Sequence, residues 1–411
     1  MRQGHGNSQY RYLVKEVELF GLWRIFEDQQ EVPMKFLHLS DLHLGKSVHE
    51  FSLIEDQEYI LKKIIEVVEA EAPQCMLIAG DVFDRTIAST EALHLLDDFL
   101  VALAKRDVQV FMISGNHDSA DRLAFGARLI AESGIHIARG FDGEVVKHTV
   151  SDEHGEVDIY LLPFLKPAHV KRFFPEAEIG SWTDALNTVI KASPVDSERR
   201  NVIVAHQFVT GAFRCESEDI SVGGADNVDA SVFEGFDYVA LGHLHGAQSV
   251  GRETARYCGT PLKYSFSEAN QEKSVSVVEL AEKGNVTIRE IPLVPKRDMR
   301  EMKGTYLEVT AKDFYKDLNL DDYYRITLTD EEDQPDALGK LRILYPYLMR
   351  LDYDNKRTRA ESDFSTSVDV TRFTPLQLFE LLYKEQNNNE LSDVQRAYLN
   401  EVIERVWEGV Q

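Results

Sequence analysis

The sequence predicts an α/β fold with at least partly parallel sheets, divided over two or three domains. From Met34 to about Pro292, short apolar runs alternate with segments of helical periodicity, an order typical of helices that connect strands. With 411 residues the chain is too long for one core, since single cores rarely grow beyond about 250–300 residues. The composition, 43% hydrophobic and 28% charged, is that of a globular protein, and no apolar run is long enough to cross a bilayer, so we expect no membrane insertion.

The periodicity of the apolar residues predicts the individual elements. Two segments with apolar residues at i, i+3, i+4 and i+7 are expected to be amphipathic helices, over 54–72 and 89–106. Short runs rich in β-branched residues are expected to be buried strands, over 75–80, 108–114, 158–164, 201–206 and 237–242. A strand, a helix and a strand are expected over 323–330, 335–347 and 348–355, followed by two amphipathic helical segments within 375–407.

These patterns divide the chain into four parts. Residues 1–33 lie outside the α/β pattern and are expected to be a non-native or disordered extension, because codons for Gln30, Glu31 and Val32 can form a ribosome-binding purine run just before Met34. Residues 34–295 form the main domain. A linker with prolines and charges leads into a small α/β module over 296–360, and 361–411 form a polar connection followed by helices.

The net charge of −25 argues against binding nucleic acid through overall charge, because duplex affinity comes mainly from Lys and Arg that neutralise phosphates. If DNA is the substrate, metal ions, local basic patches or a partner must supply the attraction. The three cysteines, Cys75, Cys215 and Cys258, form no CxxC pair, which favours a reducing cytoplasm. No P-loop is present, so this chain alone is not expected to bind ATP.

Five motifs that each end an apolar run carry the chemistry: FLHLSDLH, CMLIAGDVFD, VFMISGNHD, NVIVAH and DYVALGHLH. The ends of strands in an open α/β sheet are where ligands bind. A mixed carboxylate, amide and imidazole set at such ends suits two divalent cations. With four imidazoles in the set, manganese is expected and magnesium is the alternative. The seven candidate metal ligands are Asp41, His43, Asp81, Asn116, His206, His243 and His245.

The spacing of the candidate ligands indicates how they share the ions. In an extended segment, residues two apart point to the same side, so Asp41 and His43 are expected on one ion. His243 and His245 repeat this spacing. Asp81 opens the GDVFD motif directly after a strand and is expected to bridge the two ions through its two oxygens.

The GNHD motif is expected to supply the proton donor. Adjacent residues point in opposite directions, so Asn116 should face the metals and His117 the substrate. A departing alkoxide needs a proton, and His117 is the candidate general acid. Asp118 or Asp84 is expected to orient His117 and keep it protonated.

The order DLHLG, GDVFD, GNHD, H and GHLH resembles the calcineurin-like metallophosphoesterase superfamily. From Met34 onwards, the motifs SDLHLGK, GDVFDR, GNHDS and YCGTPLKYSFSE, with the small module and the C-terminal helices, resemble more narrowly the SbcD family of bacterial nuclease subunits. The resemblance implies a two-sheet sandwich flanked by helices over 34–295, a DNA-capping α/β domain over 296–360, and helices within 361–411 that clasp an SbcC-type ATPase.

The same resemblance implies the activity and the ligand sets. The activity would be 3′-to-5′ exonuclease on double-stranded DNA and endonuclease on single strands and hairpins, in DNA repair, recombination and replication, with a homodimer of this chain inside a heterotetramer. Carried over by motif, one manganese ion would be held by Asp41, His43 and His245 and the other by Asn116, His206 and His243, with Asp81 shared and His117 as the catalytic histidine.

Four residues are candidate DNA contacts, and two other functions stay open. Arg122, Lys263, Tyr264 and Arg297 could contact phosphates, although an ordinary surface role explains the basic ones about as well. A phosphoesterase for small nucleotides or phosphoproteins would use the same metals, but would not need the module and the C-terminal helices. A noncatalytic scaffold would not need the complete set of ligands.

Overall fold

The computed structural model describes residues 33–213, 215, 218, 226–332, 334–356, 358, 376–377, 379–380, 383 and 391–408. The expected N-terminal extension therefore lies outside the described residues, apart from Pro33. In the described part of the chain, no helix combines the length and the apolar character needed to span a bilayer. All three cysteines are free.

The main domain contains two six-stranded sheets, both largely parallel as expected. The first has the order β14-β13-β1-β4-β5-β6, in which β1, β4, β5 and β6 are parallel, β13 is antiparallel to β1, and β14 is antiparallel to β13. Its strands are β1 (Met34–Leu39), β4 (Cys75–Ala79), β5 (Gln109–Ile113), β6 (Ile135–Ile137), β13 (Ser274–Leu280) and β14 (Val286–Pro292).

The second sheet has the order β11-β12-β10-β9-β8-β7, with the four inner strands parallel and β7 and β11 antiparallel at its edges. Its strands are β7 (Val146–Asp152), β8 (Gly155–Leu162), β9 (Arg200–His206), β10 (Tyr238–Gly242), β11 (Gln248–Val250) and β12 (Arg252–Tyr257). Every strand expected in this part of the chain is present, within a few residues of its expected bounds.

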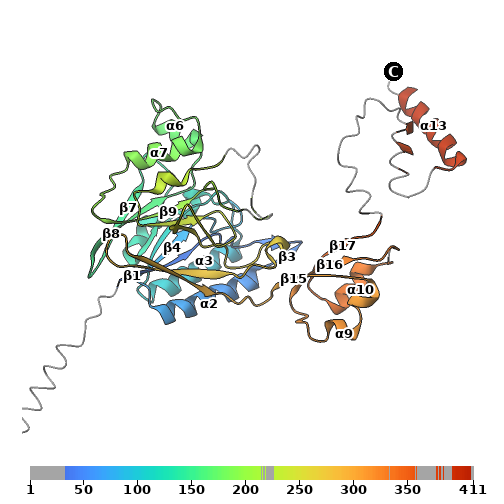
Figure 1. The fold of residues 1–411 in the computed structure, drawn as a ribbon, viewed down its shortest axis with the longest axis horizontal. Coiled ribbons are helices and arrows are strands. Elements are labelled where there is room, and N and C mark those ends of the chain that lie inside the picture. The colour runs from blue at the N-terminus through green and yellow to red at the C-terminus, as the bar shows by residue number, and fades with distance from the viewer. Residues whose placement is uncertain are drawn as a thin grey trace, which may run out of the picture.

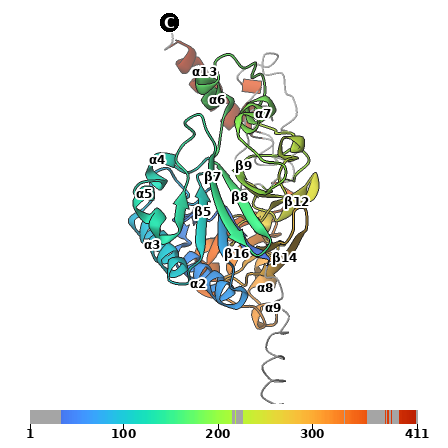
Figure 2. The same ribbon diagram turned by 90° about the vertical axis from the view of Figure 1, so that its left-hand side faces the viewer.

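The two sheets pack face to face and helices cover their outer faces, so the two-sheet sandwich is confirmed (Figures 1 and 2). Successive side chains of a strand point to opposite faces. In β4, Cys75, Leu77 and Ala79 belong to the core between the sheets, whereas Met76 and Ile78 pack under the helices. The long expected helices are α2 (Ile54–Glu71) and α3 (Thr90–Ala104) on the first sheet, and α6 (Pro167–Phe173) and α7 (Trp182–Ala192) cover the second.

Short elements complete the main domain. They are the hairpin β2 (Ser47–Val48) and β3 (Phe51–Ser52), the helices α4 (Ala120–Leu123) and α5 (Ala127–Ile130), and the 3-10 turns η1 (Ala131–Ser133), η2 (Ala230–Phe233) and η3 (Phe266–Glu268). The hairpin and η3 lie on the side of the domain that meets the C-terminal module (Figure 1).

The C-terminal module is a three-stranded parallel sheet with its own apolar core (Figure 1). Its elements are β15 (Met299–Gly304), α8 (Tyr306–Val309), α9 (Lys312–Tyr315), β16 (Tyr323–Leu328), α10 (Ala337–Leu344) and β17 (Leu348–Tyr353). The expected strand, helix and strand are β16, α10 and β17. The structure adds the strand β15 before them: Met302 of β15 packs against the module core, whereas Met299 packs against the core of the main domain.

The final described element is α13 (Asp393–Glu408), which matches the last expected helix. Ser392 begins it with a reciprocal cap: the Gln395 amide donates to Ser392 Oγ at 3.3 Å and the Ser392 amide donates to Gln395 Oε1 at 2.9 Å. The helix expected before it is described only at 376–377, 379–380 and 383.

Candidate metal centre

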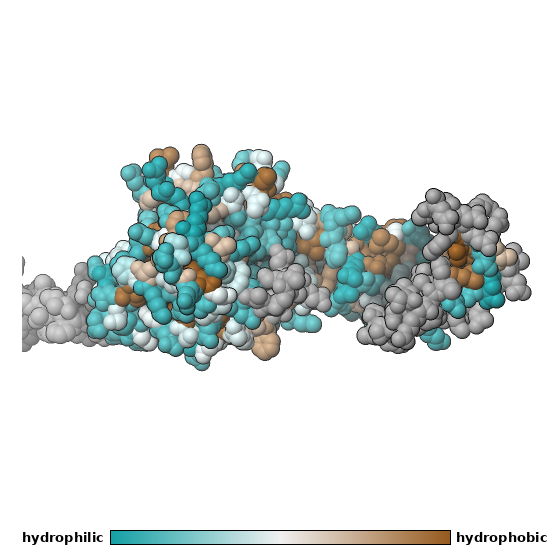
Figure 3. Space-filling model, turned by 90° about the horizontal axis from the view of Figure 1, so that it is seen from above, coloured by the Kyte–Doolittle hydropathy of each residue, from teal (hydrophilic) through white to brown (hydrophobic). Residues whose placement is uncertain are grey.

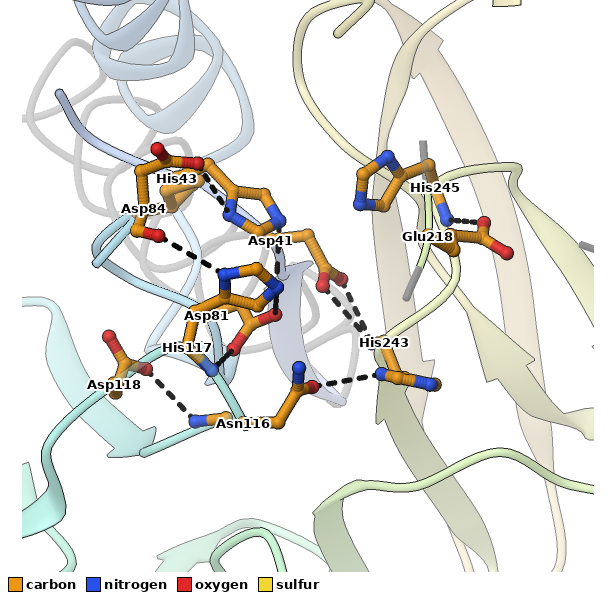
Figure 4. Close-up of polar contacts among 12 residues, drawn as sticks. Asp41, His43, Asp81, Asp84, Asn116, His117, Asp118, Glu218, His243 and His245 are labelled. Atoms are coloured by element: carbon orange, nitrogen blue, oxygen red, sulfur yellow. Dashed lines mark hydrogen bonds and ion pairs between the residues drawn. The ribbon is translucent and has the colours of Figure 1, made fainter. Parts of the chain in front are cut away.

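The five motifs meet at one edge of the sandwich, where the strands end (Figure 4). Asp41 and Asp81 follow β1 and β4 by two residues, Asn116 follows β5 by three, His206 ends β9, and His243 directly follows β10. The two sheets come very close here. A Cβ atom on Gly242 of β10 would lie 1.9 Å from the Ala79 carbonyl oxygen of β4, so only glycine fits.

The backbone of the loops that carry Asp41, His43 and Asp81 is not extended. Asp41 and His43 lie on the same side, but not because the chain is extended there, as the argument from residue spacing assumed. Asp41 and His43 have positive φ angles of 52° and 43°, and Asp81 has 48°. Their amides continue the pairing of β1 with β4, since Asp41 N donates to the Gly80 carbonyl and His43 N to the Asp81 carbonyl, both at 2.9 Å. Asp41 and His43 lie on the same side because both adopt left-handed conformations that the neighbouring loop holds in place. The alternation of side chains along a strand is not the reason. Left-handed non-glycine residues are strained and concentrate at functional sites.

The first group of ligands consists of Asp41, His43 and His245. One ligand atom from each lies within 4.8 Å of the others. His43 is buried, and neither of its ring nitrogens has a hydrogen-bond partner among the described residues. Burial also lowers the pKa of His43 well below its ordinary value, so the imidazole is neutral. A buried, neutral imidazole has a free lone pair on one ring nitrogen, which fits a metal ion.

The second group centres on Asn116. Its Oδ1 lies 3.0 Å from His206 Nε2 and 3.0 Å from His243 Nδ1 (Figure 4 shows the latter contact). The other nitrogen of His206 lies 2.8 Å from the Ala79 carbonyl oxygen, which fixes the ring. Burial alone would lower the pKa of His206, but the carboxylates of Asp81 and Asp41 outweigh it and raise the pKa to about 9.

Asp81 lies between the two groups. Its Oδ2 is 3.5 Å from His206 Nε2 and 3.8 Å from His43 Nε2, and its Oδ1 accepts a hydrogen bond from the His117 amide at 2.9 Å. Burial raises the pKa of Asp81, but the adjacent imidazoles outweigh burial and hold that pKa well below its usual range. Oδ1 is engaged by the backbone, and Oδ2 faces both groups.

His243 and His245 separate onto different groups. Their repeated spacing predicts that they lie together, but the backbone turns at His243, whose φ is 101°. His245 lies with Asp41 and His43, with ring centroids of His43 and His245 5.2 Å apart, whereas His243 lies beside Asn116. This arrangement matches the grouping that the family resemblance implied.

His117 lies at the open side of the centre. Its side chain is 27% exposed, and its Nε2 is 3.9 Å from Asp81 Oδ2. Its Nδ1 lies 3.1 Å from the backbone carbonyl oxygen of Asp84. Asp84 therefore orients His117 through its backbone, while its carboxylate pairs with Lys46 Nζ at 2.7 Å and lies 3.6 Å from His43 Nδ1.

Asp118 has a different role from the expected one. Its carboxylate accepts hydrogen bonds from the amides of Val82, Phe83 and Gly115 at 2.9–3.0 Å, so it ties the Asp81 loop to the GNHD loop rather than orienting His117. Burial and the nearby Asp81 raise the pKa of Asp118 to about 6, despite these three donors.

Several supporting residues have no motif and were missed. Gln57, on α2, donates from Nε2 to the His43 carbonyl at 2.7 Å and accepts from the Gly45 amide at 2.9 Å. Around the other histidine of the first group, Glu218 accepts from the His245 amide at 2.7 Å and Glu268 Oε1 lies 3.4 Å from His245 Nδ1. A buried polar residue inside an amphipathic helix, such as Gln57, is the only sequence signal that could have identified any of them.

Three of the four residues expected to contact DNA are largely buried and bonded within the chain. Lys263 is 12% exposed and bonds Asp298 at 2.7 Å. Tyr264 is buried, its hydroxyl donates to the Leu42 carbonyl, and its ring lies 5.5 Å from the His43 ring. Arg297 is 12% exposed and bonds Asp56 at 2.8 Å. Only Arg122, on α4, is exposed.

Comparisons with known proteins agree with the fold. A family model described as calcineurin-like phosphoesterase matches residues 34–247, and one described as type 5 capsule protein repressor C-terminal domain matches 295–387. The SbcD subunit of the SbcCD nuclease of Staphylococcus epidermidis is 30% identical over 376 residues, which cover 90% of this chain and 98% of that protein. The corresponding SbcCD subunit of Staphylococcus saprophyticus is 33% identical over 339 residues, covering 82% and 87%.

A solved structure, a dimetal phosphatase from Danio rerio, aligns with 64% of this chain and 96% of its own at 13% identity, with a TM-score of 0.39. The matches to the two staphylococcal proteins span nearly their whole length and include both the main domain and the C-terminal module. The chain belongs to the calcineurin-like phosphoesterase superfamily and, within it, to the SbcD family of SbcCD nuclease subunits.

Proposed function

We propose that this chain is the metal-dependent nuclease subunit of an SbcCD-type complex and hydrolyses phosphodiester bonds in DNA. The observation that carries the proposal is the convergence of seven buried or half-buried polar side chains from five strand ends at one edge of the sandwich. Gathering carboxylates and imidazoles out of water costs free energy, so such a cluster indicates a functional site.

The candidate ligands fit two divalent ions. Asp41, His43 and His245 would hold one, Asn116, His206 and His243 the other, and Asp81 would be shared between them. Bound ions of this kind lower the pKa of a water molecule and stabilise the charge that develops at phosphorus. The four imidazoles favour manganese over magnesium, which prefers oxygen ligands.

His117 would supply the proton for the departing alkoxide. A carbonyl oxygen only accepts hydrogen bonds, so the contact with the Asp84 carbonyl keeps the proton of the neutral ring on Nδ1. Nε2 is then the atom that gains and releases a proton on the open side of the centre. General acids of this kind contribute about 10²–10⁴-fold to the rate.

The affinity for DNA is proposed to come from a small number of exposed basic side chains and from a partner. Arg122 on α4 is exposed and Arg85, which follows Asp84, is 81% exposed. Figure 3 shows a largely hydrophilic surface on the main domain, with apolar patches on the C-terminal module. At a net charge of −25, the remaining affinity would come from the ATPase partner through effective concentration.

The assembly and the mode of cleavage are part of the same proposal. The module over 296–360 would cap the DNA, and the C-terminal helices would bind an SbcC-type ATPase, which binds the ATP, in a cytoplasmic heterotetramer with two copies of this chain. Phe379 and Tyr398 are 41% and 66% exposed and would be available to a partner helix. Cleavage would be 3′-to-5′ on duplex DNA and endonucleolytic on hairpins and single strands.

The test is cleavage of blunt duplex and hairpin DNA by the full chain, with and without the ATPase partner, in manganese or magnesium. We expect manganese-dependent cleavage that Asp81→Asn abolishes. His117→Ala should bind manganese normally, lose about 10²–10⁴-fold on DNA, and lose much less on bis(p-nitrophenyl) phosphate, whose leaving group needs no proton. His94→Ala, an exposed histidine on α3, is the matched control and should be unchanged.

Two results would contradict the proposal. DNA left uncut in every condition, together with rapid hydrolysis of mononucleotides, would favour the small-substrate phosphoesterase. Equal losses of His117→Ala on both substrates would remove the general-acid assignment and leave the nuclease assignment standing.

A further inference from the structure

One strand end at the metal centre carries no candidate ligand. β8 runs parallel to β9 and pairs Leu162 with Ala205, the residue before His206, so both strands end at the same edge of the second sheet. The segment that follows β8 is 163–166, with the sequence PFLK, and α6 begins directly after it. This segment therefore lies beside the second group of ligands, although it contains no Asp, Asn or His.

Contacts with both sheets and with α7 fix Phe164 of this segment against the centre. Its amide donates to the carbonyl of Ser114, two residues before Asn116, at 3.0 Å. The centre of its ring lies 6.1 Å from the ring centre of His206 and 5.9 Å from that of Trp182 on α7. The half-buried Phe164 thus determines where the chain leaves the metal centre.

Lys166 places an exposed positive charge next to this ring. Its Nζ lies 5.9 Å from the centre of the Phe164 ring, so the ammonium group and the His206 ring are neighbours of the same phenyl ring. Lys166 precedes the first residue of α6 in an extended conformation, and Pro167 begins the helix. Because proline fixes its own φ angle and suits the first helical position, the backbone of Lys166 is held in place.

Lys166 differs from other basic residues near the centre in having no carboxylate partner. Lys46 bonds Asp84 at 2.7 Å, and Lys273 bonds Glu268 at 2.5 Å. Lys166 forms no ion pair with any residue that the structure describes. In a chain with 70 acidic and 45 basic residues, a free lysine beside the metal centre is unusual, and its charge is available to an anion.

Exposed basic side chains then flank the centre on both sheets. Arg85 and Arg122 belong to segments that follow strands of the first sheet, whereas α6 covers the second. α6 itself, with the sequence PAHVKRF, carries a further exposed lysine and arginine and no acidic residue. A DNA strand that crosses the centre from one sheet to the other would meet positive charge on either side.

We propose that Lys166 binds a phosphate of the DNA strand next to the phosphate that is cleaved, on the side of the centre formed by His206. The proposal rests on the proposed function, since it takes DNA as the substrate. A lysine binds phosphate as a point charge and needs no fixed geometry, which suits an exposed side chain. Such a contact positions the strand and reads no base sequence.

The contact is tested by the salt dependence of DNA binding. Affinity of the full chain for a blunt duplex is measured by fluorescence anisotropy in EDTA, which prevents cleavage, at about 50 and 200 mM salt. One phosphate contact contributes about 0.9 to the slope of log affinity against log salt. Lys166→Ala should lose this contribution, so the ratio of its Kd to that of the unmodified chain should fall about threefold between the two salt concentrations. Lys166→Arg should keep the slope.

Lys191→Ala is the matched control. Lys191 is also an exposed lysine in the layer of α6 and α7, and it forms no ion pair within the described part of the chain. It lies near the end of α7 remote from Trp182, about 14 Å further along the helix axis. Removing it lowers the total charge by the same amount, but should leave the slope unchanged.

The position of the contact is tested by cleavage in manganese of duplexes that carry one uncharged methylphosphonate near the cleaved linkage. In the unmodified chain, the neutral group should raise KM severalfold at one position next to that linkage. In Lys166→Ala it should raise KM no further at this position, because both changes remove the same contact. The effect should appear in KM rather than in kcat, since Lys166 does not touch the reacting phosphate.

Three results would overturn the contact: an unchanged slope in Lys166→Ala, an equal loss of slope in Lys191→Ala, or additive effects of Lys166→Ala and the methylphosphonate at every position. Failure of the proposed function looks different. An unmodified chain that binds DNA but cuts none in manganese would contradict the nuclease assignment, while the slopes still report on Lys166. A chain that binds no DNA even at low salt would contradict both.

Discussion

Gln57 is the most informative single residue to change, because it holds the metal loop without being a candidate ligand. Replacing it by leucine keeps the size of the side chain but removes its amide. The Gly45 amide would then lose its partner, and the His43 carbonyl would keep only the hydrogen bond from the Lys46 amide at 3.0 Å. At about 1–3 kcal/mol for one unpaired group, Gln57→Leu should destabilise the chain by about 1–3 kcal/mol.

The same substitution should weaken metal binding, since the carbonyl that it releases belongs to His43. Groups that orient metal ligands typically account for about 10–100-fold in metal affinity or activity when removed. The assay is manganese binding and DNA cleavage, measured beside urea unfolding. Ile64→Ala, two turns further along α2 and fully buried against the core, is the matched control, with a loss of about 2–5 kcal/mol.

The two variants separate positioning from stability. At a temperature where both are folded, Ile64→Ala should bind manganese and cleave DNA like the unmodified chain, and only Gln57→Leu should be impaired. Normal manganese affinity in Gln57→Leu would refute the positioning role. Equal impairment in Ile64→Ala would show that the centre responds to stability alone.

Three further predictions concern the sandwich and the DNA contact. Arg200→Met should cost about 3–5 kcal/mol in urea unfolding, because it leaves the carboxylate of Asp152 buried without its bidentate partner. Burial raises the pKa of Asp152 but Arg200 lowers it more, so this carboxylate stabilises the fold fully above about pH 4, and the contribution disappears as pH falls through the lowered pKa. The unfolding midpoints of Arg200→Met and of the unmodified chain should therefore converge as the pH falls below about 4. Gly242→Ala should prevent folding or cost more than about 3 kcal/mol, whereas Gly284→Ala, at a hairpin with nothing within 4 Å, should cost about 1 kcal/mol by thermal melting. Arg122→Ala should reduce the slope of log affinity for DNA against log salt by about 1, and an unchanged slope would exclude a phosphate contact.

The sequence was sufficient for the strands, the long helices and the residues that gather at the sheet edge. Apolar runs of five to seven residues that end in a polar motif have few alternatives, because a buried parallel strand needs them. The convergence of the motifs then follows from topology, since the carboxyl ends of parallel strands meet. No knowledge of loop conformation was needed for this.

The directions of the side chains required the structure. The expectation for Asp41 and His43 assumed an extended chain, and the two residues share a side because hydrogen bonds to Gly80 and Asp81 hold them in left-handed conformations. The prediction from spacing fails for His243 and His245 for the same reason. A contact with a loop that lies 40 residues away in the chain cannot be derived from local spacing.

The orienting group of His117 could not be predicted for a related reason. Asp118 and Asp84 were both plausible as carboxylates, but one carboxylate serves three amides and the other serves Lys46, so a backbone carbonyl is what remains for Nδ1 of His117. Sequence motifs identify side chains, and in this centre part of the work is done by the backbone.

The burial of three of the expected DNA contacts and the acidic charge of the chain have one explanation. The chain has 70 acidic and 45 basic residues, so a lysine or arginine near the core usually finds a carboxylate, as Arg297 finds Asp56 and Lys263 finds Asp298. A basic side chain that pairs with a carboxylate inside the chain cannot contact DNA. The acidic groups that remain in excess on the surface repel phosphates over a Debye length of about 8–10 Å. The chain alone should therefore bind DNA weakly even with a complete metal centre, and the affinity gained from a partner should exceed any gain from improving a single arginine. A complete metal centre on a chain with weak affinity of its own for DNA is consistent with a subunit to which a partner delivers the substrate.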